Sequence, residues 1–400
     1  MSLSLFEKSE KVSLLITIGS GMISAGLVTY SISQKPTIIY SVFLPFKIEE
    51  SPEKNKLAST MNSLLGQVSS LVIKDGLSQP YWKGKKKHIY SALVSFSSPW
   101  FVSKIKKIEL QEDKAFVVGQ SFIQSILESE KKIFVDEING NKSKKSPDSI
   151  IVIENAFTDF KINGYLITNY LGQKTKNLTT SLYMSAVPKS VVDIVYGQLS
   201  KHFSIKAENI SMNSFPFISF KVSENLFPAL NDFLLVDVTA EMTDVVLINK
   251  KSVAEIVSFP SGRNFIIRQI SKKFDVSTEI AESLLRMSSG KKSDDETAAQ
   301  MQEVLSDAEK EWSIYFENAF TELSKSAVLP PVACLSAGED VADLYSGFLE
   351  IQKEDETAEF RKNIQVFHLD ERAMSHLYNT DPKFKPNVFL SILTIFSINS

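Results

Sequence analysis

The sequence is poor in the residues that build metal sites and disulfides. Its 400 residues include one cysteine, Cys334, and four scattered histidines. A single cysteine excludes an internal disulfide, and no histidine and cysteine cluster has the spacing of a zinc site. The sequence also lacks a strong excess of charge of either sign, since its formal net charge is −3. The overall charge therefore does not indicate a nucleic-acid-binding protein, and we expect no nucleic-acid partner.

Long apolar runs of the kind that span a membrane are also missing. Residues 14–32 are uncharged and long enough to span, but glycine, serine and threonine interrupt them. Glu7 and Glu10 precede this segment, where a signal peptide would carry basic residues. Residues 388–398 are too short to span and lack the basic face of an interfacial helix. We therefore expect strands in the first segment and a buried terminal element in the second.

Three common site motifs are absent as well. Residues 19–24 place Ser24 where the dinucleotide-binding motif needs its third glycine. Gly290, Lys291 and Lys292 lack the upstream glycine and the trailing serine or threonine of a Walker A loop. No serine lies in a Gly-x-Ser-x-Gly elbow. None of these three site types is predicted.

What the sequence does contain is ample material for a large α/β protein. It is 43% apolar and 23% charged, and 400 residues exceed what one hydrophobic core usually serves. A pattern of strand, tight turn and two further strands occurs near 12–48 and again near 233–259. This repeated pattern predicts two similar lobes that face one another.

A specific helix or strand is predicted for several segments. Residues 53–73 have the apolar spacing of a helix. Residues 150–156 and 157–163 are predicted as two strands, and residues 215–222 as a strand or another buried segment. The longest predicted helix, 297–326, has an apolar seam that fits a coiled coil or one helix face on a sheet. Because that seam extends over fewer than four heptads, we favour packing on a sheet.

A short basic run, Trp82-Lys-Gly-Lys-Lys-Lys-His88, separates the first helix from the next strand. Such a run could bind phosphate or lipid headgroups. Because short basic runs are common on protein surfaces, a solvated loop is the simpler interpretation.

The hairpin predicted near residues 234–246 has acidic and polar residues at its bend. Residues 234–238 are an apolar strand that holds Asp237 near its end, and the next strand begins at Thr243 and Asp244. Turn amides can bind phosphate, and a carboxylate at a strand end can hold hydrated Mg²⁺. A hairpin with polar residues at its bend explains the same pattern, so both interpretations stay open.

Three segments resemble the nucleotide-binding motifs of the actin-like ATPase superfamily in the right order. Residues 15–25 resemble the phosphate-1 motif, residues 236–245 the phosphate-2 motif, and residues 331–338 the adenosine motif. The phosphate-2 segment and the helices after it are most similar to FtsA and PilM. Those proteins carry a small inserted subdomain, and residues 101–185 fit its place.

The resemblance implies an α/β, actin-like (ribonuclease H-like) two-lobed fold with a small inserted α+β subdomain. The implied division is residues 1–100 for the first part of the first lobe, 101–185 for the insert, 186–230 for the second part of the first lobe, and 231–400 for the second lobe, with a helical part near 263–330. The implied nucleotide-binding residues are Gly19, Ser20, Gly21, Asp237, Thr239, Thr243, Asp244, Gly262, Glu282 and Gly338. Asp237 would hold Mg²⁺ and, in an active enzyme, would be the catalytic residue.

The sequence departs from the family pattern in its cleft. Thr17 replaces the phosphate-1 aspartate, and Thr239 and Glu241 replace the two phosphate-2 glycines. A carboxylate at Glu241 would face a phosphate, and like charges 4 Å apart at a dielectric of 20 repel by about 4 kcal/mol. The adenosine motif keeps one glycine, Gly338, and Leu285 stands where a basic residue is often expected. ATP and Mg²⁺ are the ligands that the resemblance implies, and these departures predict weak or lost binding and no competent hydrolysis.

The function implied by resemblance to PilM is a cytoplasmic scaffold at the inner face of the cell membrane. It would bind the cytoplasmic segment of a membrane protein, a PilN-like partner, in a type IV pilus or related secretion assembly. In PilM-like proteins the inserted subdomain shapes the groove for a short peptide. We therefore expect the contact surface within 101–185, while a homo-oligomer or filament stays open.

Two alternatives remain. An FtsA-like cell-division protein would tether filaments to the membrane, but FtsA-like proteins end in a linker and a basic amphipathic helix. An active ATPase of the chaperone or sugar-kinase type would need the carboxylate and glycines that are replaced here.

Overall fold

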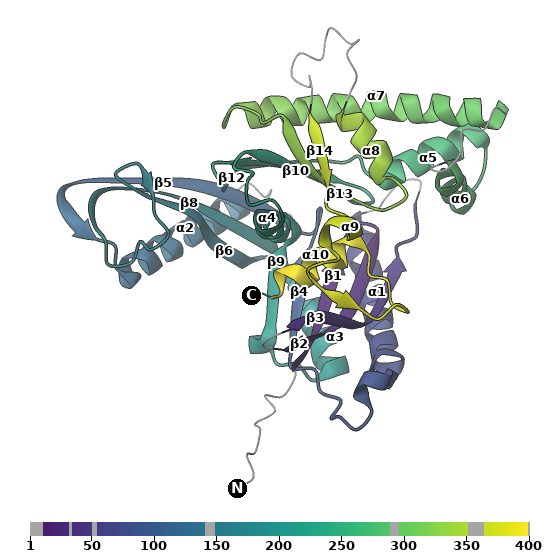
Figure 1. The fold of residues 1–400 in the computed structure, drawn as a ribbon, viewed down its shortest axis with the longest axis horizontal. Helices are drawn as coiled ribbons and strands as arrows, with labels where there is room; N and C mark the ends of the chain where they lie inside the picture. Colours follow the sequence, from purple (N-terminus) through teal and green to yellow (C-terminus); the bar gives the residue numbers. More distant parts are fainter. Residues whose placement is uncertain are drawn as a thin grey trace.

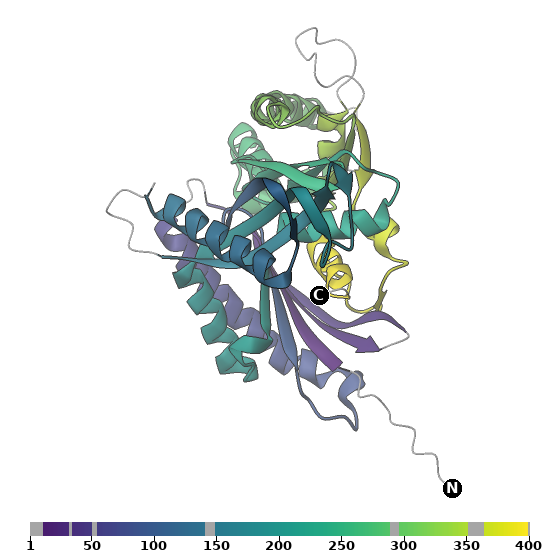
Figure 2. The ribbon, with the colours of Figure 1, turned by 90° about the vertical axis from the view of Figure 1, so that its left-hand side faces the viewer.

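The computed structural model describes residues 11–31, 34–49, 54–140, 149–288, 296–350 and 364–398. These residues form three β-sheets with helices on their faces (Figure 1). Two of the sheets belong to two lobes that lie one above the other, and the third projects sideways from their junction. In Figure 2 this projecting part faces the viewer, with the first lobe below it and the second above.

The first lobe is a six-stranded mixed sheet in the order β15-β3-β2-β1-β4-β9. Its strands are β1 (Lys11–Ile18), β2 (Met22–Ser31), β3 (Gln34–Pro45), β4 (Ser91–Phe96), β9 (Ile210–Ser214) and β15 (Asn379–Thr380). One face is covered by α1 (Lys54–Lys74) and α3 (Lys189–Phe203), whose apolar sides pack on β1, β2 and β4. The short helices η1 (Gly76–Ser78), η2 (Pro80–Trp82) and η3 (Ala207–Asn209) lead into the strands.

The second lobe is a five-stranded sheet in the order β12-β11-β10-β13-β14. Its strands are β10 (Phe233–Val238), β11 (Thr243–Asn249), β12 (Ser252–Phe259), β13 (Val332–Ala337) and β14 (Gln365–His368). Its outer face packs against α5 (Arg263–Phe274), α6 (Thr278–Ser288), α7 (Glu296–Ser324) and α8 (Ala342–Leu349). The seam of α7 faces this core and not a partner helix, so the sheet-packed interpretation of 297–326 is confirmed.

The projecting part is a four-stranded antiparallel sheet, hereafter the insert. Its order is β5-β8-β6-β7, with strands β5 (Val102–Val117), β6 (Ile150–Ile162), β7 (Tyr165–Leu166) and β8 (Lys174–Pro188). Helix α2 (Gln120–Gly140) covers one face. The two strands expected at 150–163 are one long strand, β6, because a register irregularity against β8 lets it continue where local composition suggests a break.

Between the two large sheets lies a middle layer that the sequence did not specify. Helix α4 (Phe215–Leu226) and the C-terminal α10 (Val388–Phe396) pack against each other and against apolar side chains from both sheets. A helix that is apolar on all sides belongs in such an interior position. Residues 215–222, left open as a strand or a buried segment, are therefore the buried start of a helix, and 388–398 is the buried terminal element that was expected.

The C-terminal tail differs from the expected division of lobes. After β14 and α9 (Glu371–Met374), β15 pairs in parallel with β3 of the first lobe. Helix α10 then contacts β1, β2 and β3. The tail therefore packs with the first lobe and the middle layer, where its apolar side chains share a core with α4 and the first sheet.

The segment 14–32 forms β1 and β2 within the first sheet as far as residue 31. Among the described residues, no helix combines the length and the apolarity that crossing a membrane requires.

Candidate functional site

The two hairpin bends that the sequence singled out meet between the lobes. The bend at Gly19–Gly21 joins β1 to β2, and Ser20 Oγ lies 2.9 Å from Thr239 Oγ1 in the bend between β10 and β11. The N–H of Glu241 donates to the same Ser20 oxygen at 2.9 Å. Because Thr239 Oγ1 donates to the carbonyl of Met242, the Ser20 hydroxyl donates to Thr239. The two bends therefore contact each other directly across the lobes.

The approach of the bends depends on glycine at one position. A Cβ atom built on Gly21 would lie 2.0 Å from the Cβ of Ala240, which is closer than two carbon atoms can pack. Gly21 is therefore required so that the lobes can touch here.

The predicted metal ligand Asp237 and its neighbour Asp244 lie behind these bends. Asp237 on β10 and Asp244 on β11 are register partners and are almost fully buried. Ser336 Oγ donates to Asp237 Oδ1 at 2.8 Å, and Ser98 Oγ, from the first lobe, donates to Asp244 Oδ1 at 2.6 Å. The second oxygen of each carboxyl group has no hydrogen-bond partner in the described part of the chain.

Burial determines the protonation of this pair. It raises the pKa of Asp237 well above its usual value, and the neighbouring Asp244 adds to the rise. Burial also raises the pKa of Asp244, although the hydrogen bonds from Ser258 and Ser98 oppose it. A carboxyl group whose pKa is raised in this way favours its neutral form.

A cavity of about 710 Å³ opens beside the bends. Six of the ten predicted nucleotide-binding residues line it: Gly19, Ser20, Gly21, Thr239, Glu282 and Gly338. The other four lie outside its lining: Asp237, Thr243, Asp244 and Gly262. Thr243 is buried and donates to the carbonyl of Ser261 at 2.6 Å. The structure therefore brings the loop residues of the motifs and Glu282 together and leaves Asp237 and Asp244 out of the lining.

Glu241 does not face the cavity, which corrects the expectation of repulsion there. Its carboxylate forms an ion pair with Arg268 on α5, with Oε2 2.6 Å from Nη2. Asn264 Nδ2 donates to the other carboxylate oxygen at 2.7 Å. The side chain turns toward these donors because they neutralise a charge that the bend would otherwise leave unpaired.

Arg263, the first residue of α5, was not predicted as a site residue. Its Nε and Nη2 donate to Asp340 Oδ2 at 2.8 and 2.5 Å, and Nη2 also donates to Glu282 Oε1 at 2.7 Å. Arg286 forms a second ion pair with Glu282 at 3.1 Å. The Arg263 side chain thus links α6 to the loop that follows Gly338, the two parts that the resemblance assigns to adenosine. The sequence feature that could have identified Arg263 is its position directly after Gly262, a predicted nucleotide-binding residue.

Several groups that Mg-ATP would contact in the cavity bond to one another. The N–H of Glu241, which a phosphate would need as a donor, already donates to the Ser20 hydroxyl. Arg263 bonds to both Glu282 and Asp340 and so joins α6 to the loop after Gly338. Asp237 is buried outside the lining. Within the described residues, no group of three or more histidine, cysteine or acidic side chains could hold a metal ion.

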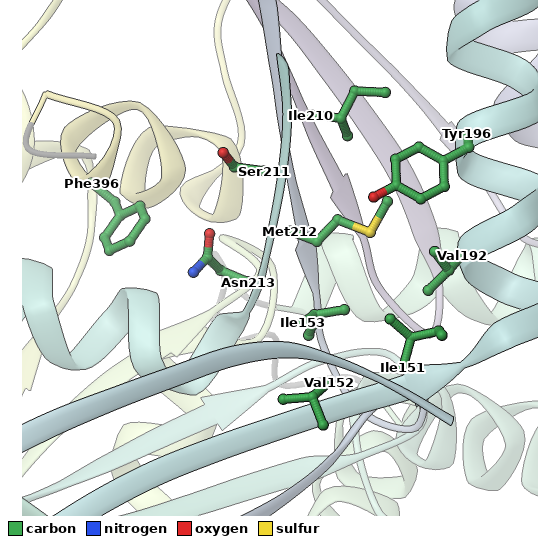
Figure 3. A pocket seen from close by; sticks show the side chains of 10 residues that line it. All are labelled: Ile151, Val152, Ile153, Val192, Tyr196, Ile210, Ser211, Met212, Asn213 and Phe396. Atoms are coloured by element: carbon green, nitrogen blue, oxygen red, sulfur yellow. The ribbon is translucent and has the colours of Figure 1, made fainter. Parts of the chain in front are cut away.

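A second cavity, of about 500 Å³, lies where the insert meets the first lobe. We call it the groove. It is lined by Ile151, Val152, Ile153, Val192, Tyr196, Ile210, Ser211, Met212, Asn213 and Phe396. Figure 3 shows that Ile210 and Met212 point to the side of β9 that faces Val192 and Tyr196 of α3, whereas Ser211 and Asn213 point to the side of Phe396. The groove therefore runs along β9 and reaches both of its faces.

Strand edges define the groove. Strand β9 is the last strand of its sheet and pairs on one side with β4. Strand β6 pairs with β8 on one side, and on the other it pairs with β7 at Lys161 and Ile162, far from the groove. The groove residues 151–153 and 210–213 therefore lie on two strand edges that face each other but are not paired in the described sheets. Such edges present backbone N–H and C=O groups that can pair with another chain.

Glu154 fastens the insert to the first lobe at the end of the groove. It follows the register irregularity between Val152 and Glu154 in β6, which directs its side chain toward β9. Asn213 Nδ2 donates to Oε1 at 2.6 Å, and Ser214 Oγ and Ser185 Oγ donate to Oε2 at 2.6 and 3.1 Å. Burial raises the pKa of Glu154 to about 7, although the hydrogen bonds from Ser214, Asn213 and Ser185 oppose the rise.

Comparison with known proteins supports this architecture. No protein-family model and no curated protein matches the sequence. Among solved structures, the chain is similar to one described as the PilM-PilN type IV pilus biogenesis complex, with a TM-score of 0.62 and 14% identity over 97% of this chain and 98% of that one. Weaker similarities include a Bacteroides thetaiotaomicron protein with an actin-like ATPase fold and unknown function (TM-score 0.44, 12% identity, 98% and 99% covered). The ethanolamine utilization protein EutJ from Carboxydothermus hydrogenoformans is another (TM-score 0.43, 10% identity, 96% and 89% covered). The chain therefore shares its two-lobed α/β fold with the structure described as the PilM-PilN complex.

Proposed function

We propose that this protein is a PilM-like scaffold that holds an extended cytoplasmic segment of a membrane protein in the groove. It would act at the cytoplasmic face of the membrane, in a type IV pilus or related secretion assembly. The observation that carries the proposal is the pair of open strand edges, β6 and β9, that border an apolar cavity.

The chemistry of the groove selects an extended apolar segment. An added strand would form main-chain hydrogen bonds with a free edge, and its alternate side chains would enter the cavity. On one face of β9 these side chains would meet Met212, Ile153 and Tyr196, which favour apolar partners. On the other face Asn213 and Ser211 offer polar contacts. The similar PilM structure was determined as a complex with PilN, which supports a PilN-like occupant here.

The nucleotide cleft supports a scaffold and not an ATPase. Its bends contact one another, and the predicted metal ligand Asp237 lies outside the cavity. We propose that ATP and Mg²⁺ bind weakly or not at all.

A pair of matched substitutions tests the groove. Ile153→Glu places a charge in the apolar lining, whereas Ile314→Glu places the same charge on the exposed surface of α7, where Ile314 is 60% exposed. The ligands are fluorescent peptides covering the cytoplasmic segments of the single-span membrane proteins of the source organism, measured by anisotropy. We expect one segment to bind the unchanged protein and the Ile314→Glu variant equally, with at least roughly tenfold weaker binding to Ile153→Glu. Equal binding to both variants would refute the groove as the binding site.

A further inference from the structure

The basic run at 83–88 is part of a larger positively charged surface. In the first sheet, β1, β3, β4 and β9 all begin at the same edge, as their registers show. The loops and helix ends before these strands therefore gather at one end of the lobe, opposite the bend at Gly19–Gly21. This end lies at the bottom of the molecule in Figure 1.

Exposed lysines from five segments collect at this end, which we call the basic end. They are Lys11, Lys35, Lys74, Lys83, Lys85, Lys86, Lys87, Lys201 and Lys206. Asp75 and Glu208 are acidic residues at the same end, and Glu208 pairs with Lys206 at 3.6 Å. The sequence contains no aspartate or glutamate from residue 76 to residue 108. The basic end is thus strongly positive in a chain whose formal net charge is −3.

The loop that contains Lys83, Lys85, Lys86 and Lys87 is anchored by the buried side chain of Trp82. Trp82 is 4% exposed and its Nε1 donates to the carbonyl of Gly76 at 3.0 Å. The N–H of Lys85 donates to the carbonyl of Trp82, and the Lys85 ammonium lies 3.8 Å from the centre of the Tyr81 ring. The charges are therefore presented by a structured loop.

We propose that the basic end binds the surface of an anionic membrane. Clusters of four to eight basic residues are attracted to anionic headgroups. Apolar groups at this end are exposed beside the lysines: Ile73 is 37% and Tyr90 39% exposed. Tyrosine is enriched at membrane–water interfaces because its ring is apolar and its hydroxyl is polar.

The composition of the basic end favours lipid over nucleic acid. Its basic residues are lysine, whereas arginine is the residue that makes bidentate contacts with phosphodiesters and bases. Lysine acts as a hydrated point charge, which suits diffuse attraction to a headgroup layer. The uneven distribution of charge would also orient the molecule, with the basic end toward the membrane and the rest of the chain away from it.

The position of the groove agrees with this orientation, although the proposal does not depend on it. Ile210 lines the groove and is the first residue after the segment that carries Lys206. An occupant of the groove that comes from the membrane would therefore enter near the basic end.

Vesicle flotation of the full chain tests the proposal. The probes are phosphatidylcholine vesicles with and without phosphatidylglycerol. One variant combines Lys83→Gln, Lys85→Gln, Lys86→Gln and Lys87→Gln. The control removes the same charge from exposed lysines of the second lobe, with Lys272→Gln, Lys273→Gln, Lys310→Gln and Lys325→Gln. Circular dichroism establishes that both variants are folded.

We expect flotation with the anionic vesicles that weakens as salt increases, falls at least roughly tenfold in the first variant and is unchanged in the control. No dependence on phosphatidylglycerol, or an equal loss in both variants, would overturn the proposal. A gel-shift assay with duplex DNA is run in parallel. DNA binding that requires the same four lysines, without vesicle binding, would assign the surface to nucleic acid instead. None of these outcomes depends on whether a peptide binds the groove.

Discussion

The nucleotide cleft and the groove are both concave, but their chemistry is opposite. In the cleft, polar groups satisfy one another: Ser20 bonds to Thr239 and Glu241, and Arg263 neutralises Glu282 and Asp340. In the groove the lining is mainly apolar, and two strand edges are not paired with another strand of the described sheets. A surface that is satisfied internally has little to offer a ligand, whereas an unsatisfied one gains free energy on binding. The comparison teaches that motif resemblance and binding capacity can lie at different places in one fold.

The largest expected effect concerns Glu154, which fastens the insert beside the groove. Glu154→Ala would leave Ser214, Asn213 and Ser185 without their shared acceptor, and we expect a loss of about 3 kcal/mol in unfolding free energy. Glu154→Gln keeps an acceptor and should lose less. Urea denaturation measures both. If the alanine variant is as stable as the unchanged protein, the network does not fasten the insert.

Glu154 also predicts a pH dependence. Its pKa is raised from 4.5 to about 7 in the folded protein, so between these values the folded state binds one more proton than the unfolded chain. Stability should therefore fall as pH rises through this window, by up to about 3 kcal/mol, and level off above it. The raised pKa values of Asp237 and Asp244 act in the same direction. Glu154→Gln should reduce the slope without removing it, and an unchanged slope would contradict the assignment.

A smaller effect is expected in the cleft. Arg263→Ala leaves Asp340 and Glu282 without their shared cation, and we expect a loss of about 1–2 kcal/mol because the three side chains are partly exposed. Arg263→Lys retains the charge but not the forked geometry, so its loss should be intermediate. Thermal unfolding with and without Mg-ATP provides the measurement. A large stabilisation of the unchanged protein by Mg-ATP would show that the cleft is a working nucleotide site.

The smallest effect is expected at Asp237. Because burial favours its neutral form, Asp237→Asn can still accept from Ser336 and should change stability by less than about 1 kcal/mol. We expect no phosphate release from ATP by either protein. Turnover that is present in the unchanged protein and lost in Asp237→Asn, but kept in Asp307→Asn on the surface of α7, would instead support the active ATPase.

Local patterns in the sequence predicted much of the fold. The tight bend at Gly19–Gly21 and the paired acidic residues Asp237 and Asp244 were located correctly, since both depend on residues close in the chain. The division between 150–156 and 157–163 was not, because β6 continues through an irregularity that pairing with β8 stabilises. The direction of Glu241 was also missed. Its partner Arg268 lies 27 residues away, and no local pattern indicates that they pair.

The sequence alone determined the kind of fold, the two bends and the loss of family residues such as the aspartate replaced by Thr17. The tertiary structure decided which distant residues contact one another. The return of the tail to the first lobe, the bridging by Arg263, and the placement of β6 beside β9 all join residues far apart in the chain. Such contacts form when whole elements pack, because their free energy comes from burial and pairing between surfaces that no single segment contains.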